Sequence, residues 1–332
     1  MLTARDSGAR QVRLTCLYAG IALGRYGFPA GHPLGVDRQG AFLREAQRQG
    51  LLANTRICEA RAATGEELGR FHTPRLIDKV RRAERDQIEF LDNGDTPVFP
   101  GVFDASAHVV GAALDGLEHV MAEHSLASFQ PIGGLHHAGR DHCAGFCVFN
   151  DLGVVIETLR RNYGVKRVAY VDIDVHHGDG VFYAYEDDPD LIVADIHEDG
   201  RFLYPGTGRE DETGNGAARG SKLNIALGPS SGDAEFMQAW PRMEQHLVRF
   251  EPEFILFQCG ADGLRADPLA HLDYTPAVHA HATRRLLDIA GRFAAGRLMA
   301  FGGGGYDRGN LAAAWSAVLR EIVAANSRGR PA

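Results

Sequence analysis

Five short apolar runs, rich in β-branched residues, alternate with longer segments of helical periodicity along this 332-residue chain. The runs cover residues 167–172, 191–196, 223–227, 254–258 and 298–301. Continuous apolar strands separated by helices are typical of a parallel sheet that helices cover on both faces. The sequence therefore predicts an α/β fold, in which ligands bind beyond the carboxyl ends of the strands.

The helical segments and the lack of linkers set the expected domain organisation. Apolar side chains recur at helical spacing, as in Val109, Ala113, Leu117 and Val120. Helices are predicted over residues 39–49, 74–90, 103–123, 148–162, 234–250, 276–290 and 310–325. From residue 12 onward the chain has no Ser/Pro-rich linker, charge block or internal repeat. We therefore expect one domain over 12–328, preceded by a polar, flexible N-terminus over 1–11.

Composition excludes several classes of protein. With 43 acidic and 35 basic residues the net charge is −8, which argues against a nucleic-acid binder. The five cysteines form no CxxC pair, so packing thiols in a reduced, cytoplasmic setting are expected. No apolar run is long enough for a membrane span. The 40 glycines and 15 histidines are the unusual feature, and many glycines lie beside histidines and aspartates, which indicates tight loops around a site.

The densest polar cluster directly follows the run over 167–172. It reads Asp172-Ile-Asp174-Val-His176-His177-Gly-Asp179-Gly. Side chains alternate faces along an extended segment, so Asp172, Asp174 and His176 point the same way. Burying three ionisable groups on one face is costly unless an ion or partners compensate them. The cluster therefore predicts that Asp174 and His176 bind a divalent cation.

A second run, over 254–258, is followed by Cys-Gly-Ala-Asp262. Taken alone, Asp262 is more typical of a cap or a turn than of a metal ligand. As a third ligand beside Asp174 and His176 it completes a zinc site of the catalytic kind, which keeps one position open for water or substrate.

Two adjacent histidines, His136 and His137, follow a Gly-Gly pair in a predicted loop. They suit either metal binding or proton handling. Asp172 and Asp179 remain once the metal ligands are assigned, and each could accept the Nδ1–H of one histidine. This arrangement favours general acid–base catalysis on metal-bound water.

Four consecutive glycines, 302–305, precede Tyr306. Such a run lets the backbone approach a ligand closely. No Gly-Lys-Ser/Thr follows, so a phosphate-binding P-loop is not indicated. Tyr306 is predicted to donate its phenolic hydrogen to a developing oxyanion, and a packed aromatic ring with a solvated hydroxyl is the alternative.

Together these motifs resemble the histone deacetylase superfamily, in a bacterial-type member. That superfamily includes acetoin-utilisation proteins and acetylpolyamine amidohydrolases. The matching segments run along nearly the whole chain: His32–Arg38, Phe71-His72, Gly101–Asp104, Leu135–Ala138, Ala144–Asp151, Asp172–Gly180, Tyr204–Gly208, Gly260–Asp262, Asp267–Leu269 and Gly302–Tyr306. The resemblance implies an arginase-like α/β fold with one parallel sheet of about eight strands and one divalent metal.

The resemblance also implies a role for each matching residue. Asp174, His176 and Asp262 would bind Zn²⁺, with Fe²⁺ as the alternative ion. His137 would be the principal general base and acid and His136 its electrostatic partner. The supporting and polarising groups would be Asp172 for His136, Asp179 for His137, and Tyr306 for the amide carbonyl. Substrate-binding positions would be Asp95, Gly145, Phe146, Tyr204, Leu269 and Gly304. A structural potassium site would involve Asp172, Asp174, His176 and Asp195.

Two positions depart from the family's pattern. Tyr204 stands where the second wall of the acyl-lysine tunnel usually has Phe, which alters the polarity of that wall. Asp195 stands where the potassium site usually has a hydroxyl residue.

The predicted reaction is removal of acetyl or other acyl groups from the ε-amino group of lysine in proteins or peptides. Asp95 lies six residues before Gly101, a spacing similar to the lysine-deacetylase loop whose Asp accepts hydrogen bonds from substrate backbone amides. A polyamine has no such amides, so an acetylpolyamine amidohydrolase is the alternative, and in isolation Asp95 is also typical of a turn. The acidic net charge suits a cationic substrate, and a homo-oligomer is compatible with the sequence.

Two other functions are weighed against this one. A catalytically inactive acyl-lysine binder would be expected to lack a ligand, the His pair or Tyr306, and none is missing. Binuclear manganese ureohydrolases resembling arginase need further carboxylates, where this chain has Gly178 and Leu264.

Overall fold

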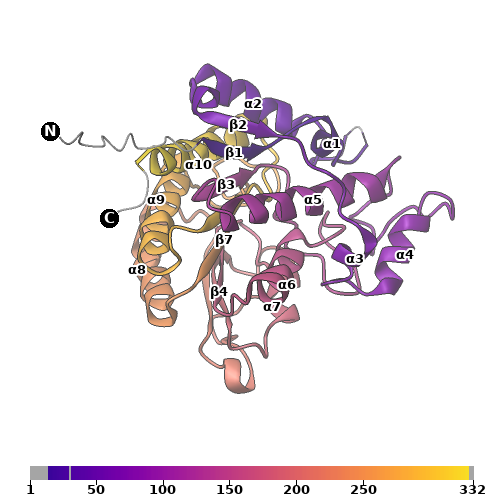
Figure 1. The fold of residues 1–332 in the computed structure, drawn as a ribbon. Helices are drawn as coiled ribbons and strands as arrows, with labels where there is room; N and C mark the ends of the chain where they lie inside the picture. Colours follow the sequence, from indigo (N-terminus) through magenta and orange to yellow (C-terminus); the bar gives the residue numbers. More distant parts are fainter. Residues whose placement is uncertain (1–13, 30, 329–332) are drawn as a thin grey trace, which may run out of the picture.

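The structure, a computed structural model, describes residues 14–29 and 31–328 (Figure 1). All eight strands of the described residues join one parallel sheet in the order β2-β1-β3-β8-β7-β4-β5-β6. The strands are β1 (Thr15–Tyr18), β2 (Thr55–Cys58), β3 (Ala127–Gln130), β4 (Val168–Asp172), β5 (Leu191–Glu198), β6 (Lys222–Leu227), β7 (Phe254–Gln258) and β8 (Leu298–Phe301). The predicted α/β fold with a parallel sheet of about eight strands is confirmed.

Helices cover both faces of this sheet. They are α1 (Ile21–Gly24), α2 (Arg38–Arg48), α3 (Gly65–Leu68), α4 (Pro74–Arg82), α5 (Val102–Met121), α6 (Asp151–Tyr163), α7 (Asp179–Ala184), α8 (Asp233–Phe250), α9 (Pro276–Phe293) and α10 (Arg308–Arg328), with short 3₁₀ turns at Leu51–Asn54 and Gly216–Ala218. Figure 1 shows α8, α9 and α10 on one side of the sheet and α5, α6 and α7 on the other.

Two hydrophobic cores result, one on each face of the sheet. Alternate side chains of a strand point to opposite faces. In β4, Val168 and Tyr170 pack with the α5–α6 core, while Ala169 and Val171 pack with the core formed by α2, α8, α9 and α10. Because both faces are buried, the strands carry continuous apolar runs rather than an alternation of apolar and polar residues.

The five strands predicted from apolar runs are confirmed, and three others were missed. β1, β2 and β3 are only four residues long and read TCLY, TRIC and ASFQ. Their polar residues hide the pattern of a buried strand, and their pairing partners lie far along the chain.

The helix predicted over 74–90 is too long at its C-terminal end. It begins at Pro74, with the Thr73 side chain accepting from the Leu76 N–H, but it ends at Arg82. Gln87 adopts a positive φ of 52°, which no helix tolerates. The chain then turns back on itself, because the Val98 N–H donates to the Glu89 carbonyl. This turn carries the loop that contains Asp95.

Helix α6 has a side-chain cap at its start and a glycine at its end. The Asn150 side chain accepts from the Gly153 N–H at 2.9 Å, and Gly164 closes the helix with a φ of 66°. Both are preferred capping arrangements. The predicted start at residue 148 was three residues too early, because Ala144 and Cys147 pair with each other in a tight turn before the helix.

The described residues contain no helix that is long and apolar enough to cross a membrane. All five cysteines are buried and unbridged, as expected for packing thiols. The flexible N-terminus predicted over 1–11 lies outside the described residues.

Candidate active site

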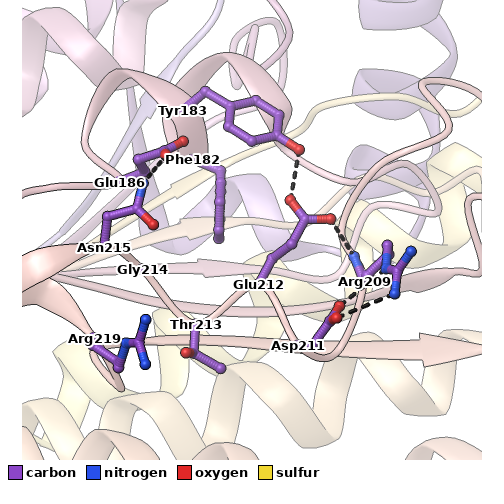
Figure 2. A pocket seen from close by; sticks show the side chains of 10 residues that line it. All are labelled: Phe182, Tyr183, Glu186, Arg209, Asp211, Glu212, Thr213, Gly214, Asn215 and Arg219. Carbon is purple, nitrogen blue, oxygen red and sulfur yellow. Dashed lines mark hydrogen bonds and ion pairs between the residues drawn. The ribbon is translucent and has the colours of Figure 1, made fainter.

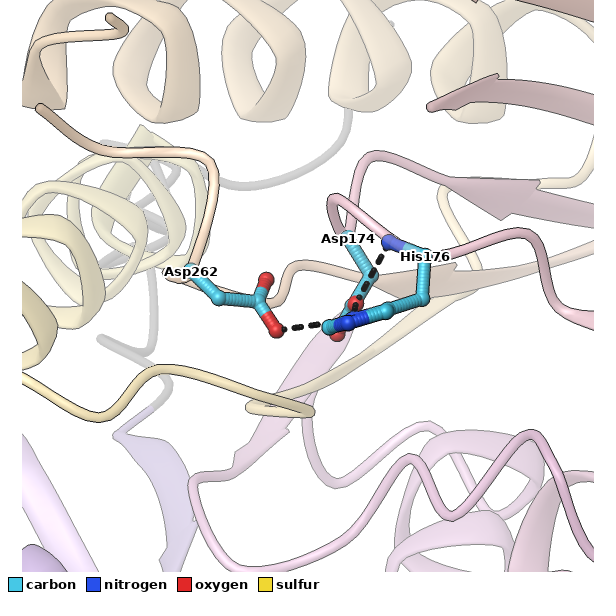
Figure 3. Close-up of side chains that lie close together, drawn as sticks. All are labelled: Asp174, His176 and Asp262. Atoms are coloured by element: carbon cyan, nitrogen blue, oxygen red, sulfur yellow. Dashed lines mark hydrogen bonds and ion pairs between the residues drawn. The ribbon is translucent and has the colours of Figure 1, made fainter. Parts of the chain in front are cut away.

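The metal-ligating side chains lie where two neighbouring strands end. β4 and β7 are paired, and Asp172 is in register with Gln258. The loop after β4 carries Asp174 and His176, and the loop after β7 carries Asp262. Their ligand atoms all lie within 4.8 Å of one another, and all three residues are buried (Figure 3). The structure thus brings together the three ligands predicted from the sequence.

The charges of these three residues fit a cation. His176 Nδ1 lies 3.1 Å from Asp174 Oδ1 and 3.2 Å from Asp262 Oδ2. The second contact is an ion pair, and the buried Asp262 Oδ2 has no hydrogen-bond donor. Burial and the charge of Asp174 raise the pKa of Asp262 to about 6. Although burial opposes a charge on His176, the two carboxylates raise its pKa to about 10.

Two carboxylates and one imidazole that converge on a buried point are ligands suited to a divalent transition metal. Three protein ligands leave a coordination position for water or substrate, as in catalytic sites. Among the described residues, no other group of three or more His, Cys, Asp or Glu side chains converges in this way.

The carboxylates are oriented by neighbouring donors. Gln258 Nε2 and the Gly304 N–H each donate to Asp174 Oδ2 at 2.8 Å. The Val175 N–H donates to Asp262 Oδ1 at 3.1 Å. Gly304 leaves room for this arrangement, because a Cβ atom there would lie 1.9 Å from Asp262 Oδ2. Gln258 is not among the predicted site residues, although its place at the end of a strand beside β4 is a signal for such a role.

The two histidines next to the metal-ligating group are held by separate carboxylates. His136 Nδ1 lies 2.8 Å from Asp172 Oδ2, and His137 Nδ1 lies 2.6 Å from Asp179 Oδ1. These are the pairings expected from the sequence. The two Nε2 atoms lie 3.1 Å apart. Burial and the nearby His136 lower the pKa of His137, whereas burial and the charges of neighbouring aspartates raise the pKa of Asp172 well above its usual range.

Tyr306 follows the glycine run, which lies against the metal-ligating group. Its backbone N–H donates to Asp267 Oδ2 at 2.8 Å, and its ring packs edge-on against Phe146 with centroids 5.9 Å apart. Burial, with the charges of Asp262 and Asp174, raises the pKa of the Tyr306 phenol well above its usual value. The hydroxyl therefore stays protonated at neutral pH.

Arg38 is a second residue that the sequence analysis did not assign to the site. Its guanidinium is buried and donates to the carbonyls of Gly305 at 3.0 Å and Gly303 at 2.6 Å. It also lies 6.0 Å from the ring centroid of Tyr306 and 5.1 Å from that of Trp315. Arg38 thus fixes the glycine run from the far end of the chain. Arg38 belongs to the His32–Arg38 segment that matches the family, and this match was the signal in the sequence for a role at the site.

The two predicted wall residues lie against other residues of the site, Phe146 against Tyr306 and Tyr204 against His137. Phe146 has a φ of 67° and donates its N–H to Thr96 Oγ1 at 3.1 Å. The Tyr204 ring is 42% exposed and lies edge-on to His137, with centroids 5.1 Å apart. At Gly145, a Cβ atom would lie 2.6 Å from His137 Cδ2, so only glycine fits there.

The two remaining predicted substrate positions lie in ordered loops. The Leu269 N–H donates at 3.1 Å to the same Asp267 carboxylate that holds Tyr306. Asp95 is exposed, and its N–H donates at 2.9 Å to Asp92 Oδ1. Asp92 also accepts from the backbone N–H groups of Gly94 and Thr96, which fixes the loop. The Asp95 carboxylate thus sits on a rigid turn.

Asp195, from the predicted potassium site, is in register with Asp172 on the adjacent strand β5 and is fully buried. Its carboxylate already has partners. Oδ1 lies 2.7 Å from His197 Nδ1, and Oδ2 accepts from the Gly178 N–H at 3.0 Å. The potassium site stays a prediction.

A pocket of about 440 Å³ lies apart from these residues and shares none of them (Figure 2). It is lined by α7 and the loop over 209–219. Its charged groups are largely paired with one another: Glu212 accepts from the Tyr183 hydroxyl at 2.6 Å and from the Arg209 N–H at 2.8 Å, and Arg209 pairs with Asp211. It therefore offers no free acid, base or metal ligand for the chemistry above.

Comparison with known proteins agrees with this geometry. The sequence profile described as "Histone deacetylase domain" matches residues 32–322. The chain belongs to the histone deacetylase family. It is 37% identical to the acetoin utilization protein AcuC of Bacillus subtilis (strain 168) over 275 residues, which are 80% of this chain and 71% of the relative. It is 30% identical to the histone deacetylase RPD3 of Saccharomyces cerevisiae over 335 residues, which are 97% of this chain and 75% of the relative.

A solved structure gives the same result for the histone deacetylase fold. The crystal structure of the HDA15 HD domain superposes with a TM-score of 0.84 at 26% identity, covering 94% of this chain and 89% of that domain. The chain is therefore an amide hydrolase of the histone deacetylase family with a buried Asp174–His176–Asp262 metal-binding group.

Proposed function

We propose that this histone deacetylase family member is a zinc-dependent enzyme that removes acyl groups from the ε-amino group of lysine in proteins or peptides. One observation carries the proposal: the metal-ligating group lies beside a pair of histidines, each of which is held by its own carboxylate. Metal-assisted hydrolysis needs these two parts together, a Lewis acid and a proton-transferring base.

Zinc is the ion we propose for Asp174, His176 and Asp262, and Fe²⁺ is the alternative with the same ligand types. When bound, such an ion polarises the acyl carbonyl and lowers the pKa of water. The remaining steps belong to residues of the chain itself.

We assign proton transfer to His137. Its Nδ1 faces Asp179 at 2.6 Å, so this nitrogen carries the hydrogen and Nε2 is the atom that exchanges protons with water and substrate. Burial lowers the pKa of His137, which favours a neutral imidazole that accepts the proton of the attacking water. The protonated member of the histidine pair then protonates the amine as it leaves.

Tyr306 would donate its phenolic hydrogen to the oxygen of the carbonyl as negative charge develops there. Its raised pKa supports this role, because a phenol that keeps its proton is a donor throughout the reaction. Phe146 and Tyr204 would form the walls along the aliphatic part of the acyl-lysine.

Asp95 favours a protein or peptide over a polyamine. Its carboxylate is exposed on a turn that Asp92 holds in place, and the same turn positions the Phe146 N–H through Thr96 Oγ1. An acceptor fixed beside the aromatic wall suits the backbone amides of a peptide.

We retain Gly145, Leu269 and Gly304 as substrate-binding positions. We also propose a structural potassium site and a cytoplasmic setting, and the sequence is compatible with a homo-oligomer. Because one of the relatives above is named for acetoin utilization, we include that process among those that the enzyme serves.

The test is a panel of kcat/KM values for acetyl-lysine and longer acyl-lysine peptides and for acetylated polyamines, with acetate release as the readout. We expect peptides to exceed polyamines, activity to disappear on chelation and return with zinc, and one metal ion per chain by mass spectrometry. Polyamine turnover above that of every peptide would overturn the proposed substrate.

A pair of variants isolates the role of Asp95. Asp95→Asn is expected to lower kcat/KM for peptides and to leave turnover of acetylated polyamines unchanged, because only peptides offer backbone amides. Asp187→Asn removes the same charge from an exposed site and serves as the control. Equal losses on both substrate classes in Asp95→Asn would contradict recognition of the peptide backbone.

A further inference from the structure

Two cysteines lie together on the opposite part of the sheet from the metal-ligating group. Cys16 is on β1 and Cys58 is on β2, the edge strand. In sheet order β1 is separated from β4 by three strands, which places the cysteines roughly 20 Å from the end of β4 at the usual strand spacing. A reaction of these thiols would therefore take place away from the site of amide hydrolysis.

The strand register puts the two thiols on one face. Cys16 is opposite Arg56, and Tyr18 is opposite Cys58. Residues two apart on a strand share a face, so Cys16 and Cys58 are diagonal neighbours on the same side of the sheet. Both belong to the same hydrophobic core, and the two thiols are close enough for each to shift the pKa of the other.

The two thiols differ in access. A pocket of about 250 Å³ opens beside the edge strand, and Cys58 lines it whereas Cys16 does not. Arg56 and His119 line the same pocket, together with the acidic residues Glu59, Asp115 and Glu118. The exposed fraction is 9% for Cys58 and 3% for Cys16. A small reagent that enters this pocket therefore contacts Cys58 before it contacts Cys16.

We propose that Cys58 and Cys16 form a site of reversible oxidation, in which Cys58 reacts with hydrogen peroxide and Cys16 closes a disulfide between β1 and β2. The Cys58 thiolate attacks one peroxide oxygen, the O–O bond breaks, and the products are a sulfenic acid on Cys58 and hydroxide, which takes up a proton to become water. The Cys16 sulfur then attacks the Cys58 sulfur and releases a second water, with the Cys16 proton going to the leaving hydroxyl. In sum, two thiols lose two electrons and two protons and peroxide becomes two waters.

The electrostatics of the two thiols support this division of roles. The neighbouring Cys16 thiol, aided by His119 and the positive charge of Arg56, lowers the pKa of Cys58 to about 7, although burial and the charge of Asp115 oppose the shift. The thiolate is the reactive form, so the accessible cysteine is also the more nucleophilic. The neighbouring Cys58 thiol and burial raise the pKa of Cys16.

The other three cysteines of the chain give an internal contrast. Burial raises the pKa of Cys143 to about 12 and raises those of Cys147 and Cys259 well above the usual value. None of the three lines the pocket beside β2. They serve as unreactive thiols within the same protein.

The experiment uses the full chain with its metal bound. Reduced protein is treated with hydrogen peroxide at pH 7, free thiols are blocked with iodoacetamide, and the digest is analysed by mass spectrometry without reduction. Because trypsin cleaves after Arg13, Arg25, Arg56 and Arg61, the disulfide would join peptide 14–25 to peptide 57–61. We expect this linked pair, two hydrogen atoms lighter than the sum of its parts, and we expect a dithiol to separate it.

Labelling rates and variants complete the test. In the folded, reduced protein iodoacetamide should label Cys58 at least tenfold faster than Cys143, and in denaturant the two rates should converge. Cys16→Ser should leave Cys58 as a sulfenic acid that a cyclic 1,3-dione traps, while the matched Cys143→Ser should still form the disulfide. Absence of the linked peptides in the unmodified chain, or equal labelling of Cys58 and Cys143, would overturn the proposal whether or not any variant folds.

Discussion

The Nε2 atoms of His136 and His137 lie 3.1 Å apart, while the Nδ1 atoms of the same rings face Asp172 and Asp179. If both imidazoles were neutral and donated from Nδ1, two lone pairs would point at each other. A hydrogen on one of the two Nε2 atoms removes this conflict. The contact therefore pairs one Nε2–H donor with one Nε2 acceptor, close to the point where the proposed reaction must protonate a leaving amine.

The carboxylate behind His137 should matter for turnover but not for metal binding. Asp179→Asn removes the charge that orients Nδ1–H and stabilises the imidazolium. We expect kcat to fall about 10–100-fold, the usual effect of losing such a partner. The measurement is kcat on an acetyl-lysine peptide together with metal content. Asp187→Asn, at an exposed site, should retain activity. Unchanged kcat in Asp179→Asn with metal bound would refute the role of this pair.

Tyr306→Phe removes one hydroxyl and leaves the packing against Phe146 in place. Loss of one oxyanion donor typically lowers kcat by about 100–1,000-fold. We expect that loss with an unchanged melting temperature and unchanged metal content. Tyr163→Phe, which removes a hydroxyl from a partly exposed ring at the end of α6, is the control. Near-normal turnover of Tyr306→Phe would remove the phenol from the mechanism.

Some parts of this site could be predicted from local sequence and others could not. Asp172, Asp174 and His176 lie within one short segment, so the geometry of a single strand end is enough to group them. Asp262 joins them only because β7 pairs with β4, and this pairing depends on the order of all eight strands. The resemblance to a known family supplied Asp262 as a ligand, whereas the strand order itself was not predicted.

Arg38 illustrates what the local pattern does not carry. It donates to carbonyls of Gly303 and Gly305, which lie more than 260 residues later in the chain. A buried arginine satisfied by backbone carbonyls leaves no charge pattern in the sequence. The same limit applies to β1 and β2, whose four-residue strands are defined by their partners rather than by an apolar run.

Stability should depend on pH through His72. This buried ring accepts from the Asn150 N–H at 2.8 Å, and burial lowers its pKa to about 4. The unfolded chain takes up a proton near pH 6.5, so His72 contributes its full share of stability above about pH 6.5. That share is lost as the pH falls toward 4. The slope reaches at most about 1.4 kcal/mol per pH unit.

His72→Gln keeps an acceptor for Asn150 but does not titrate. We therefore expect a shallower fall in the free energy of unfolding between pH 6.5 and 4, measured by urea titration at several pH values. His142→Gln replaces a histidine whose side chain is 62% exposed and should leave the slope unchanged. An identical pH dependence in His72→Gln and the unmodified chain would contradict the buried neutral state of His72.

Gly304 should be indispensable for the metal-ligating group, because its missing side chain is what allows two carboxylates to converge. A Cβ atom at this position would lie 1.9 Å from Asp262 Oδ2 and 3.0 Å from Asp174 Oδ2. Both oxygens are buried, and the Gly304 N–H already holds Asp174 at 2.8 Å, so neither carboxylate can move without losing a ligand position. Gly304→Ala is therefore expected to abolish metal binding and activity together.

The control for this substitution is Gly291→Ala in helix α9, where a Cβ atom would meet nothing within 4 Å. There alanine should raise the free energy of unfolding by about 0.5–1 kcal/mol, because it restricts the unfolded chain and favours the helix. Metal content by mass spectrometry, measured beside thermal unfolding, separates the two effects. A Gly304→Ala protein that is folded and retains one metal ion per chain would show that the carboxylates tolerate a different spacing from the one described here.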